Sequence, residues 1–275
     1  MFTISVESYN NLNMDLSNKN ILVTGAGGFG VGYGVAVALS KLGACVIVNA
    51  RSIQKAEAVA SKLPNAISIA ADITNIEEVE AMFKTLSSQV GVIHGLVNNA
   101  GIGLSKEAHK VSDEEFDNLY NIDVKAVWRL SKLFANQLIK NNCEGNIVNI
   151  SSVHTYATIS KYAIYASAKS AVEGLTKGMA VELGKYKIRV NAVAPGYVHA
   201  EQNLELIRTF ADDPELWIDT HTNDYQSLPF QINAEDCGNV VGFLLSELSR
   251  VVTGQVIYAD NGTTSMLYSN SFIDK

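Results

Sequence analysis

Short runs of apolar and β-branched residues alternate with longer stretches of helical periodicity along the chain from Asn20 onward. The run at 44–49 is apolar almost throughout, which is typical of a strand buried on both faces. The sequence predicts strands at 20–24, 44–49, 66–70, 95–98, 146–151, 189–193 and 255–259. It predicts helices at about 30–42, 52–62, 75–89, 112–141, 161–184 and 234–248.

This alternation of strands and helices indicates the fold class. Strand–helix–strand units of this kind form right-handed crossovers and a parallel sheet covered by helices on both faces. No linker, repeat or low-complexity tract divides the pattern. We therefore expect one doubly wound, Rossmann-type α/β domain over residues 14–275.

Two segments lie outside the alternation. Residues 1–13 are polar and rich in Asn, and we interpret them as an N-terminal arm. The segment 200–230 separates two core elements and carries Trp217 and two prolines. An excursion of that length is usually a lid or binding loop, so we expect it to contact substrate. A surface decoration or an oligomer contact is the alternative.

Composition and charge exclude several classes of protein. The chain has 47% hydrophobic and 18% charged residues, a mixture that can bury a core, and its net charge is −7. The chain has no excess of positive charge that would attract nucleic acid. No apolar stretch approaches the roughly 20 residues that span a bilayer. The three cysteines show neither a disulfide framework nor metal-ligand spacing. We therefore expect no metal. We also expect a cytoplasmic protein, because no secretory signal precedes the domain.

A glycine-rich loop follows the first predicted strand, between Thr24 and Gly32. Glycines let backbone N–H groups approach an anion closely, and the start of the next helix offers free donors and a positive dipole end. In this position the loop predicts a dinucleotide pyrophosphate site.

The end of the second predicted strand indicates which dinucleotide is bound. An acidic residue there would bind the ribose 2′-OH, whereas an arginine would pair with a 2′-phosphate. The sequence continues with Arg51 and Ser52 and has no acid. It therefore favours NADP(H) over NAD(H).

Ser152, Tyr165 and Lys169 form the candidate catalytic group. Tyr165 and Lys169 are four residues apart, so on a helix both side chains share one face. A nearby ammonium favours the phenolate and lowers the pKa of the tyrosine. With a serine hydroxyl holding the substrate oxygen, the three make an acid/base device for interconverting a carbonyl and an alcohol.

These motifs, in this order and spacing, resemble the short-chain dehydrogenase/reductase family over nearly the whole chain, in particular its 3-oxoacyl-thioester and carbonyl reductase branch. The resemblance rests on the glycine loop, Asp72-Ile73, the run 98–101, Ser152 with Tyr165-xxx-Lys169, the run 189–192 and Pro195-Gly196. It implies that Asp72 and Ile73 hold the adenine, that Lys169 holds the nicotinamide ribose, and that the segment after Pro195 wraps the nicotinamide. The resulting cofactor site comprises Gly25, Gly28, Phe29, Gly30, Val31, Arg51, Ser52, Asp72, Ile73, Asn99, Ala100, Gly101, Tyr165, Lys169, Pro195, Gly196 and Val198.

Four positions depart from the family pattern. The glycine loop carries an extra residue, which we assign to Phe29. The helix register places Asp123, and not Asn121, where the family has a catalytic asparagine, so we include Asp123 in the catalytic group. Ala200 replaces a threonine that orients the carboxamide. Asn261 replaces a glycine near the end, which we interpret as a structural change.

Two other functions remain open. Tyr162 lies seven residues before Lys169, and this spacing resembles that of enoyl-thioester reductases. The departures at Asp123 and Ala200 allow a dinucleotide-binding sensor without chemistry. We favour an NADP(H)-dependent oxidoreductase acting on a small carbonyl or secondary alcohol. The resemblance also implies a homo-oligomer, a tetramer or dimer, packed through the helices near 112–141 and 161–184.

Overall fold

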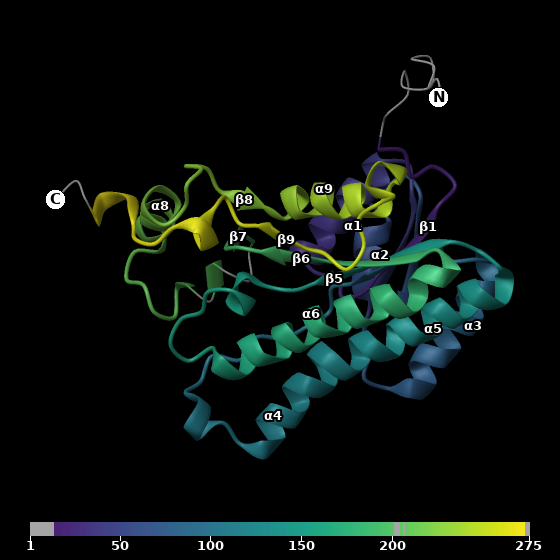
Figure 1. Cartoon of the computed structure of the whole chain (residues 1–275), viewed down its shortest axis with the longest axis horizontal. Coiled ribbons are helices and arrows are strands. Elements are labelled where there is room, and N and C mark those ends of the chain that lie inside the picture. Colours follow the sequence, from purple (N-terminus) through teal and green to yellow (C-terminus); the bar gives the residue numbers. More distant parts are fainter. Residues whose placement is uncertain (1–13, 201–203, 206, 273–275) are drawn as a thin grey trace, which may run out of the picture.

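A computed structural model of the chain describes residues 14–200, 204–205 and 207–272 (Figure 1). The expected N-terminal arm, residues 1–13, lies outside the described residues.

Seven parallel strands form one sheet in the order β3-β2-β1-β4-β5-β6-β9. The strands are β1 (Asn20–Val23), β2 (Cys45–Ala50), β3 (Ala66–Ala70), β4 (Gly95–Asn98), β5 (Gly145–Ile150), β6 (Ile188–Pro195) and β9 (Val256–Ala259). Each lies within two residues of its predicted bounds. The predicted doubly wound parallel sheet is confirmed.

Helices cover both faces of the sheet. The α-helices of the described part of the chain include α1 (Val31–Lys41), α2 (Ile53–Ala60), α3 (Ile76–Gln89), α4 (Asp113–Tyr120), α5 (Ala126–Asn141), α6 (Ala163–Leu183), α8 (Pro214–Asp224) and α9 (Ala234–Leu245). In Figure 1, α1, α2 and α9 lie above the sheet, and α3, α5 and α6 lie below it.

Alternate residues of the strands pack into two separate cores, because successive side chains of a strand point to opposite faces. Leu22 and Leu96 pack with α3, α5 and α6. Their neighbours Val23 and Val97 pack with α1, α2 and α9. The central strands are thus buried on both faces, as their apolar sequences indicate.

The predicted helix at 112–141 is interrupted. A π-helical turn over Asn121–Lys125 joins α4 to α5. Such turns insert one extra residue per turn and recur at functional sites. Here the turn carries Asp123, whose side chain is fully buried.

The segment 200–230 contains a helix that the sequence did not predict. Asp213 caps α8 by accepting a hydrogen bond from the Leu216 amide, and Pro214 occupies the first turn, a start signal that could have been recognised. The segment is flanked by a short parallel pair, β7 (Val198–His199) and β8 (Ile232–Asn233). No helix within the described ranges is both long and apolar enough to cross a membrane.

The order of the strands fixes where a ligand can bind. From β1 the chain winds outward through β2 to β3, and then returns to β4 on the other side of β1. Ligands of open α/β sheets bind outside the carboxyl ends of the strands at such a switch point. Thr24, Asn99 and Ser151 each directly follow the end of a strand at this edge.

Candidate active site

A cleft of about 840 Å³ lies along the carboxyl edge of the sheet. Its walls come from the segments that follow β1, β2, β3, β4, β5 and β6. Except for Phe29, every residue predicted for the cofactor or for catalysis lines it. These residues are Gly25, Gly28, Gly30, Val31, Arg51, Ser52, Asp72, Ile73, Asn99, Ala100, Gly101, Asp123, Ser152, Tyr165, Lys169, Pro195, Gly196 and Val198.

The N-terminus of α1 opens into this cleft. Gly30 is the N-cap residue and no side chain caps the helix, so the first backbone N–H groups have no intrahelical acceptor. Gly25 adopts a φ of +65°, and a Cβ there would lie 2.7 Å from the Cα of Ala100. The loop therefore requires glycine for its turn and leaves an uncapped helix terminus suited to an anion.

Phe29, which we predicted in the cofactor site, is not among the residues that line the cleft. Its ring packs edge-on against Tyr33 at 5.4 Å, and the Lys62 ammonium lies 4.8 Å from its centroid. The side chain is 53% exposed and lines a hollow beside α2 that shares Gly27, Gly28 and Lys55 with the cleft. The extra loop residue is thus turned towards α2, where apolar packing is available, and away from the cleft.

The end of β2 carries the groups predicted to select the cofactor. Arg51 is exposed and lines the cleft, whereas the Ser52 hydroxyl caps α2 and also bonds Gln54 at 2.7 Å. Asn49 is buried and donates to the main-chain oxygen of Ala71 at 3.2 Å. Arg51 is therefore the charged group at this position with room for a ligand.

Asp72 follows β3 on the adenine side of the predicted site. Its carboxylate accepts hydrogen bonds from the amide and hydroxyl of Thr74, at 2.8 and 2.7 Å. These bonds, with a smaller effect of the Arg51 charge, hold the pKa of Asp72 below its ordinary value. The carboxylate is ionised at neutral pH and its orientation is fixed.

Thr24 and Asn99 hold the ends of β1 and β4 together. The Thr24 hydroxyl accepts from the amides of Asn99 and Ala100, both at 3.1 Å. The Asn99 amide donates to the main-chain oxygen of Thr24 at 2.9 Å. The glycine loop and the segment after β4 are thus joined across the switch point.

Tyr165 and Lys169 lie on one face of α6, and both line the cleft with Ser152, which follows β5. The Lys169 ammonium lies 5.7 Å from the Tyr165 ring centroid and donates to the main-chain oxygen of Ile150 at 3.2 Å. Tyr165 and Lys169 therefore share one helical face, as their spacing predicts, and Ser152 lines the same cleft.

Asp123 lies beside Lys169 at the bottom of the cleft. Lys169 Nζ lies 3.0 Å from Asp123 Oδ2, and the lysine and aspartate side chains are 8% and 0% exposed. Asp123 Oδ1 also accepts from the Ile102 amide at 2.8 Å. Burial lowers the pKa of Lys169, but the negative charges of ionised Tyr165 and of Asp123 outweigh that effect and raise it above its ordinary value. Lys169 is therefore a charged ammonium at neutral pH.

Glu173, one turn beyond Lys169 on α6, was not identified from the sequence. Its Oε1 accepts from the Ser151 hydroxyl at 2.8 Å and from Thr155 Oγ1 at 2.7 Å. Thr155 Oγ1 also lies 2.8 Å from the main-chain oxygen of Ser152. Glu173 thus supports the segment that presents Ser152, and no residue-type pattern in the sequence marks this role.

Tyr162 is not among the residues that line the cleft. Its ring stacks on His154 at 4.6 Å with an interplanar angle of 8°. His154 in turn meets the edge of Tyr165 at 5.6 Å. Of the two candidate tyrosines, Tyr165 is therefore the one in the cleft beside Lys169.

Asn261 adopts a left-handed backbone, with φ at +51°, a conformation that Asn tolerates better than most residues. Its amide donates to Phe230 O at 2.7 Å and to Gln226 Oε1 at 3.0 Å. The residue that replaces the family's glycine therefore joins the end of β9 to the end of the segment 200–230.

Comparisons with known proteins agree with this geometry. Residues 25–264 match a sequence family described as enoyl-(acyl carrier protein) reductase. The chain is 33% identical to L-xylulose reductase of Mesocricetus auratus over 91% of its length and 98% of that protein. It is 32% identical to carbonyl reductase (NADPH) 2 of Sus scrofa, with the same coverage. A solved structure from Sinorhizobium meliloti 1021, provisionally described as a short-chain alcohol dehydrogenase, matches with a TM-score of 0.84 at 29% identity, covering 92% of this chain and 99% of that one.

Proposed function

The chain belongs to the short-chain dehydrogenase/reductase family, and on this premise we propose that it is an NADP(H)-dependent oxidoreductase interconverting a carbonyl and a secondary alcohol. The observation that carries the proposal is the cleft in which Ser152, Tyr165 and the buried Lys169 lie beside an uncapped helix terminus. When bound, the nicotinamide would supply or accept the hydride.

The residues at the phosphate end of the cleft fit a phosphorylated dinucleotide. The uncapped terminus of α1 suits the pyrophosphate, and Arg51 is a suitable partner for a 2′-phosphate. No carboxylate among the residues that follow β2 in the cleft would repel that phosphate. The name of the porcine relative, which includes NADPH, supports the same choice.

The residues at the other end of the cleft supply the proton chemistry. Tyr165 would give a proton to the substrate oxygen during reduction and take it back during oxidation. The Ser152 hydroxyl would hold that oxygen by a hydrogen bond. Two of the three Lys169 donors face Ile150 O and Asp123, which leaves one for the nicotinamide ribose.

Turnover tests the proposal directly. We expect the purified protein to oxidise NADPH with members of a panel of ketoses, diketones and 3-oxoacyl thioesters. Tyr165→Phe should lower kcat by at least about 100-fold, the usual contribution of general acid catalysis. Full activity of Tyr165→Phe on a substrate that the parent turns over would refute the assignment.

Enoyl-thioester reduction is the second candidate, because the matching family is described as an enoyl reductase. That reaction would use Tyr162, which stacks on His154 and does not line the cleft. Tyr162→Phe is therefore the matched variant. If it abolishes turnover of an enoyl thioester while Tyr165→Phe does not, the second candidate replaces the first. Tight cofactor binding without turnover of any compound would instead favour a dinucleotide sensor.

We also propose that the protein works in the cytoplasm as a homo-oligomer, a tetramer or dimer. A groove on α4, α5 and α6 supports the assembly: it is lined by Trp128, Ala171 and Leu175, and Trp128 is 44% exposed. Met179, which lies on α6 like Ala171 and Leu175, is buried in the core instead. Sedimentation of the purified protein would test this assembly.

A further inference from the structure

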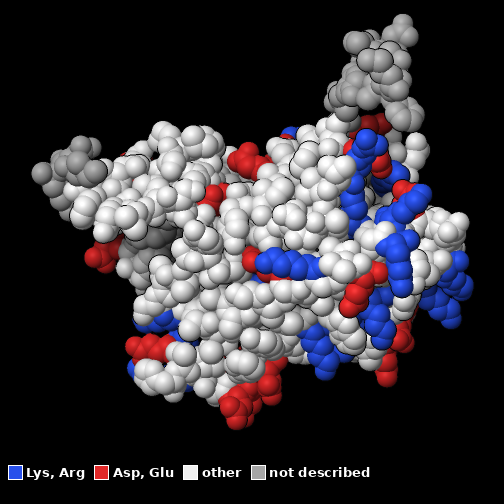
Figure 2. Space-filling view, in the orientation of Figure 1, with Lys and Arg blue, Asp and Glu red and all other residues white. Residues whose placement is uncertain are grey.

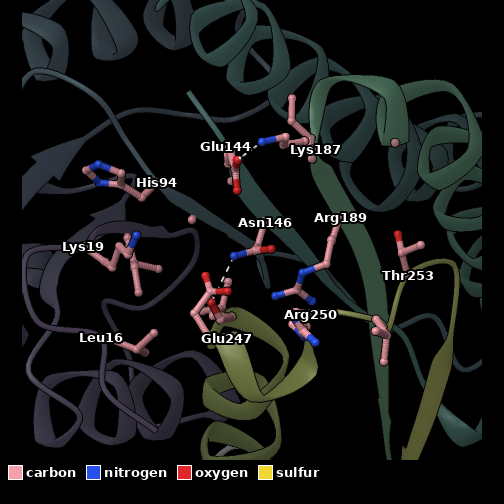
Figure 3. A pocket seen from close by; sticks show the side chains of 17 residues that line it. Leu16, Lys19, His94, Glu144, Asn146, Lys187, Arg189, Glu247, Arg250 and Thr253 are labelled. Atoms are coloured by element: carbon pink, nitrogen blue, oxygen red, sulfur yellow. Dashed lines mark hydrogen bonds and ion pairs between the residues drawn. The ribbon is translucent and has the colours of Figure 1, made fainter. Parts of the chain in front are cut away.

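A second cavity lies at the opposite edge of the sheet from the catalytic cleft (Figure 3). It has a volume of about 390 Å³ and is formed where β1, β4, β5 and β6 begin and where the segment after α9 ends. Buried apolar residues, among them Ile21, Ile188 and Leu245, form part of its wall. It shares no lining residue with the cleft.

The charge of this cavity is opposite to that of the protein. The chain carries a net charge of −7. The charged lining residues are Lys19, Lys187, Arg189, Arg250, Glu144 and Glu247. In Figure 2, Lys and Arg side chains gather over the right-hand end of the molecule, where the cavity lies.

Three cations in the cavity remain available for a ligand. Lys187 is engaged by Glu144 at 2.6 Å, which leaves Lys19, Arg189 and Arg250 against the single carboxylate of Glu247. Within the described part of the chain, these four residues form no ion pair. The cavity therefore holds two uncompensated positive charges.

Arg189 is held in a fixed position. Its Nη1 and Nη2 donate to the main-chain oxygens of Val252 and Ser246, at 3.1 and 3.0 Å. Burial lowers its pKa and the Glu247 charge opposes that effect; a guanidinium remains charged in either case. Figure 3 shows its guanidinium directed into the cavity towards Arg250. A fixed guanidinium loses little entropy on binding an anion.

His94 is a neutral residue of the cavity lining. Its Nδ1 accepts a hydrogen bond from the Asn20 amide at 3.1 Å, so the ring proton of the neutral form is on Nε2. Burial, reinforced by the charge of Lys19, lowers the pKa of His94. The imidazole thus stays neutral at pH 7 and adds no charge to the lining of the cavity, of which His94 is a part.

Basic residues at this edge have one other explanation. Helices that cross a parallel sheet end where the next strand begins, and cations near those negative helix termini are stabilising. That accounts for Lys41 and Lys140, in the last turns of α1 and α5. It also accounts for part of the setting of Arg189, whose Nη2 donates to the main-chain oxygen of Ser246, the C-cap residue of α9. It does not account for Lys19, which directly precedes β1.

From these observations we propose that the cavity is a binding site for a phosphate dianion, either free phosphate or the phosphate group of a small monoester. Two guanidiniums can bind phosphate oxygens in the bidentate manner, and the charge of the dianion matches the two uncompensated cations. Lys19, Arg189 and Arg250 come from three separate parts of the chain, so the site requires the folded sheet. The proposal does not rest on the proposed oxidoreductase function.

Equilibrium dialysis with radiolabelled inorganic phosphate tests the proposal, at constant ionic strength in chloride. Saturating NADPH is present, so that the catalytic cleft is filled. We expect one phosphate bound per chain, and at least a tenfold weaker affinity in the double variant Lys19→Ala/Arg250→Ala. The matched control is Lys84→Ala/Lys140→Ala, which removes the same charge from two exposed helical positions and should bind phosphate like the parent.

The outcomes are distinct. Absence of saturable phosphate binding, or equal weakening in both double variants, would overturn the site. Because Lys19 and Arg250 are exposed, the double variant should fold, and an unchanged thermal midpoint would verify this. Arg250→Gln alone should also weaken binding if the double variant does not fold. Displacement by glycerol 3-phosphate at a lower concentration than by unlabelled phosphate would identify a monoester as the ligand, and the reverse order would identify free phosphate.

Discussion

Lys169 and Asp123 form a buried ion pair, with 3.0 Å between Nζ and Oδ2, at the bottom of the catalytic cleft. The two residues come from α6 and from the π-helical turn before α5. The family pattern has an uncharged asparagine in place of Asp123, so this chain carries one additional negative charge beside its lysine. That charge helps to raise the pKa of Lys169 and so favours its ammonium form.

We expect Asp123→Asn to change the pH dependence of catalysis. The Asp123 carboxylate is one of the charges that raise the pKa of Lys169, so its loss should lower the pKa of Lys169. The ammonium form of Lys169, which holds the ribose in the proposed mechanism, is then lost at a lower pH. The falling limb of kcat/KM on the alkaline side should therefore move to lower pH. Glu80→Gln, an exposed change on α3, is the control, and an unmoved limb in Asp123→Asn would contradict the prediction.

Arg51→Ala should change the preference between the two nicotinamide cofactors. A hydrogen bond to a charged group contributes about 1.5–3 kcal/mol, so the affinity for NADPH should fall by roughly 10- to 150-fold. The affinity for NADH should change little, because NADH has no 2′-phosphate. Fluorescence titration of parent and variant with both cofactors measures this. Equal or tighter binding of NADH by the parent would show that the arginine is not selective.

Glu173→Ala should weaken catalysis without altering the reacting groups. The substitution leaves the Ser151 and Thr155 hydroxyls without their shared acceptor and loosens the segment that presents Ser152. We expect kcat to fall by about tenfold, which corresponds to about 1.4 kcal/mol. Glu173→Gln keeps an acceptor oxygen and should restore most of the activity. If kcat falls equally in Glu173→Gln and Glu173→Ala, the charge of Glu173 is important for catalysis and its hydrogen bonding is not.

Gly34→Ala should destabilise the fold at the contact between α1 and α9. A Cβ at this position would lie 2.1 Å from the main-chain carbon of Ala234, so the two helices must separate. Overpacking of this kind costs about 1–3 kcal/mol. Ser40→Ala on the same helix is the matched comparison, because it removes a buried hydroxyl that has no hydrogen-bond partner among the described residues. It should leave the urea midpoint unchanged or raise it, whereas Gly34→Ala should lower it.

The parallel sheet and the positions of its strands were predictable because the patterns that indicate them are local and periodic. The run 44–49 is apolar almost throughout, which indicates a strand buried on both faces. The glycine loop at Gly25 could be interpreted as a phosphate site because it comes directly after the first strand. The spacing of Tyr165 and Lys169 placed both side chains on one helical face. These features depend on residues that are close together in the sequence, or on the regular crossover of a parallel sheet.

Other features depend on contacts between distant residues and could not be predicted. Phe29 turns towards Tyr33 and Lys62 because apolar packing is available beside α2. The role of Glu173 depends on hydroxyls about twenty residues away. The second cavity, lined by Arg189, is formed by residues from opposite ends of the chain, and these residues form no sequence motif.

The short pair β7–β8 holds the two ends of the segment 200–230 together. Val198 pairs with Ile232 and His199 with Asn233, so the two ends of the segment 200–230 are held side by side at the edge of the sheet. A segment joined in this way can vary in length or be replaced as a unit while the register of the sheet is kept. The β7–β8 pair is therefore a suitable graft point. Replacing the segment between these strands with that of a relative would test our expectation that it contacts substrate, because a segment with that role should transfer the substrate preference of the relative.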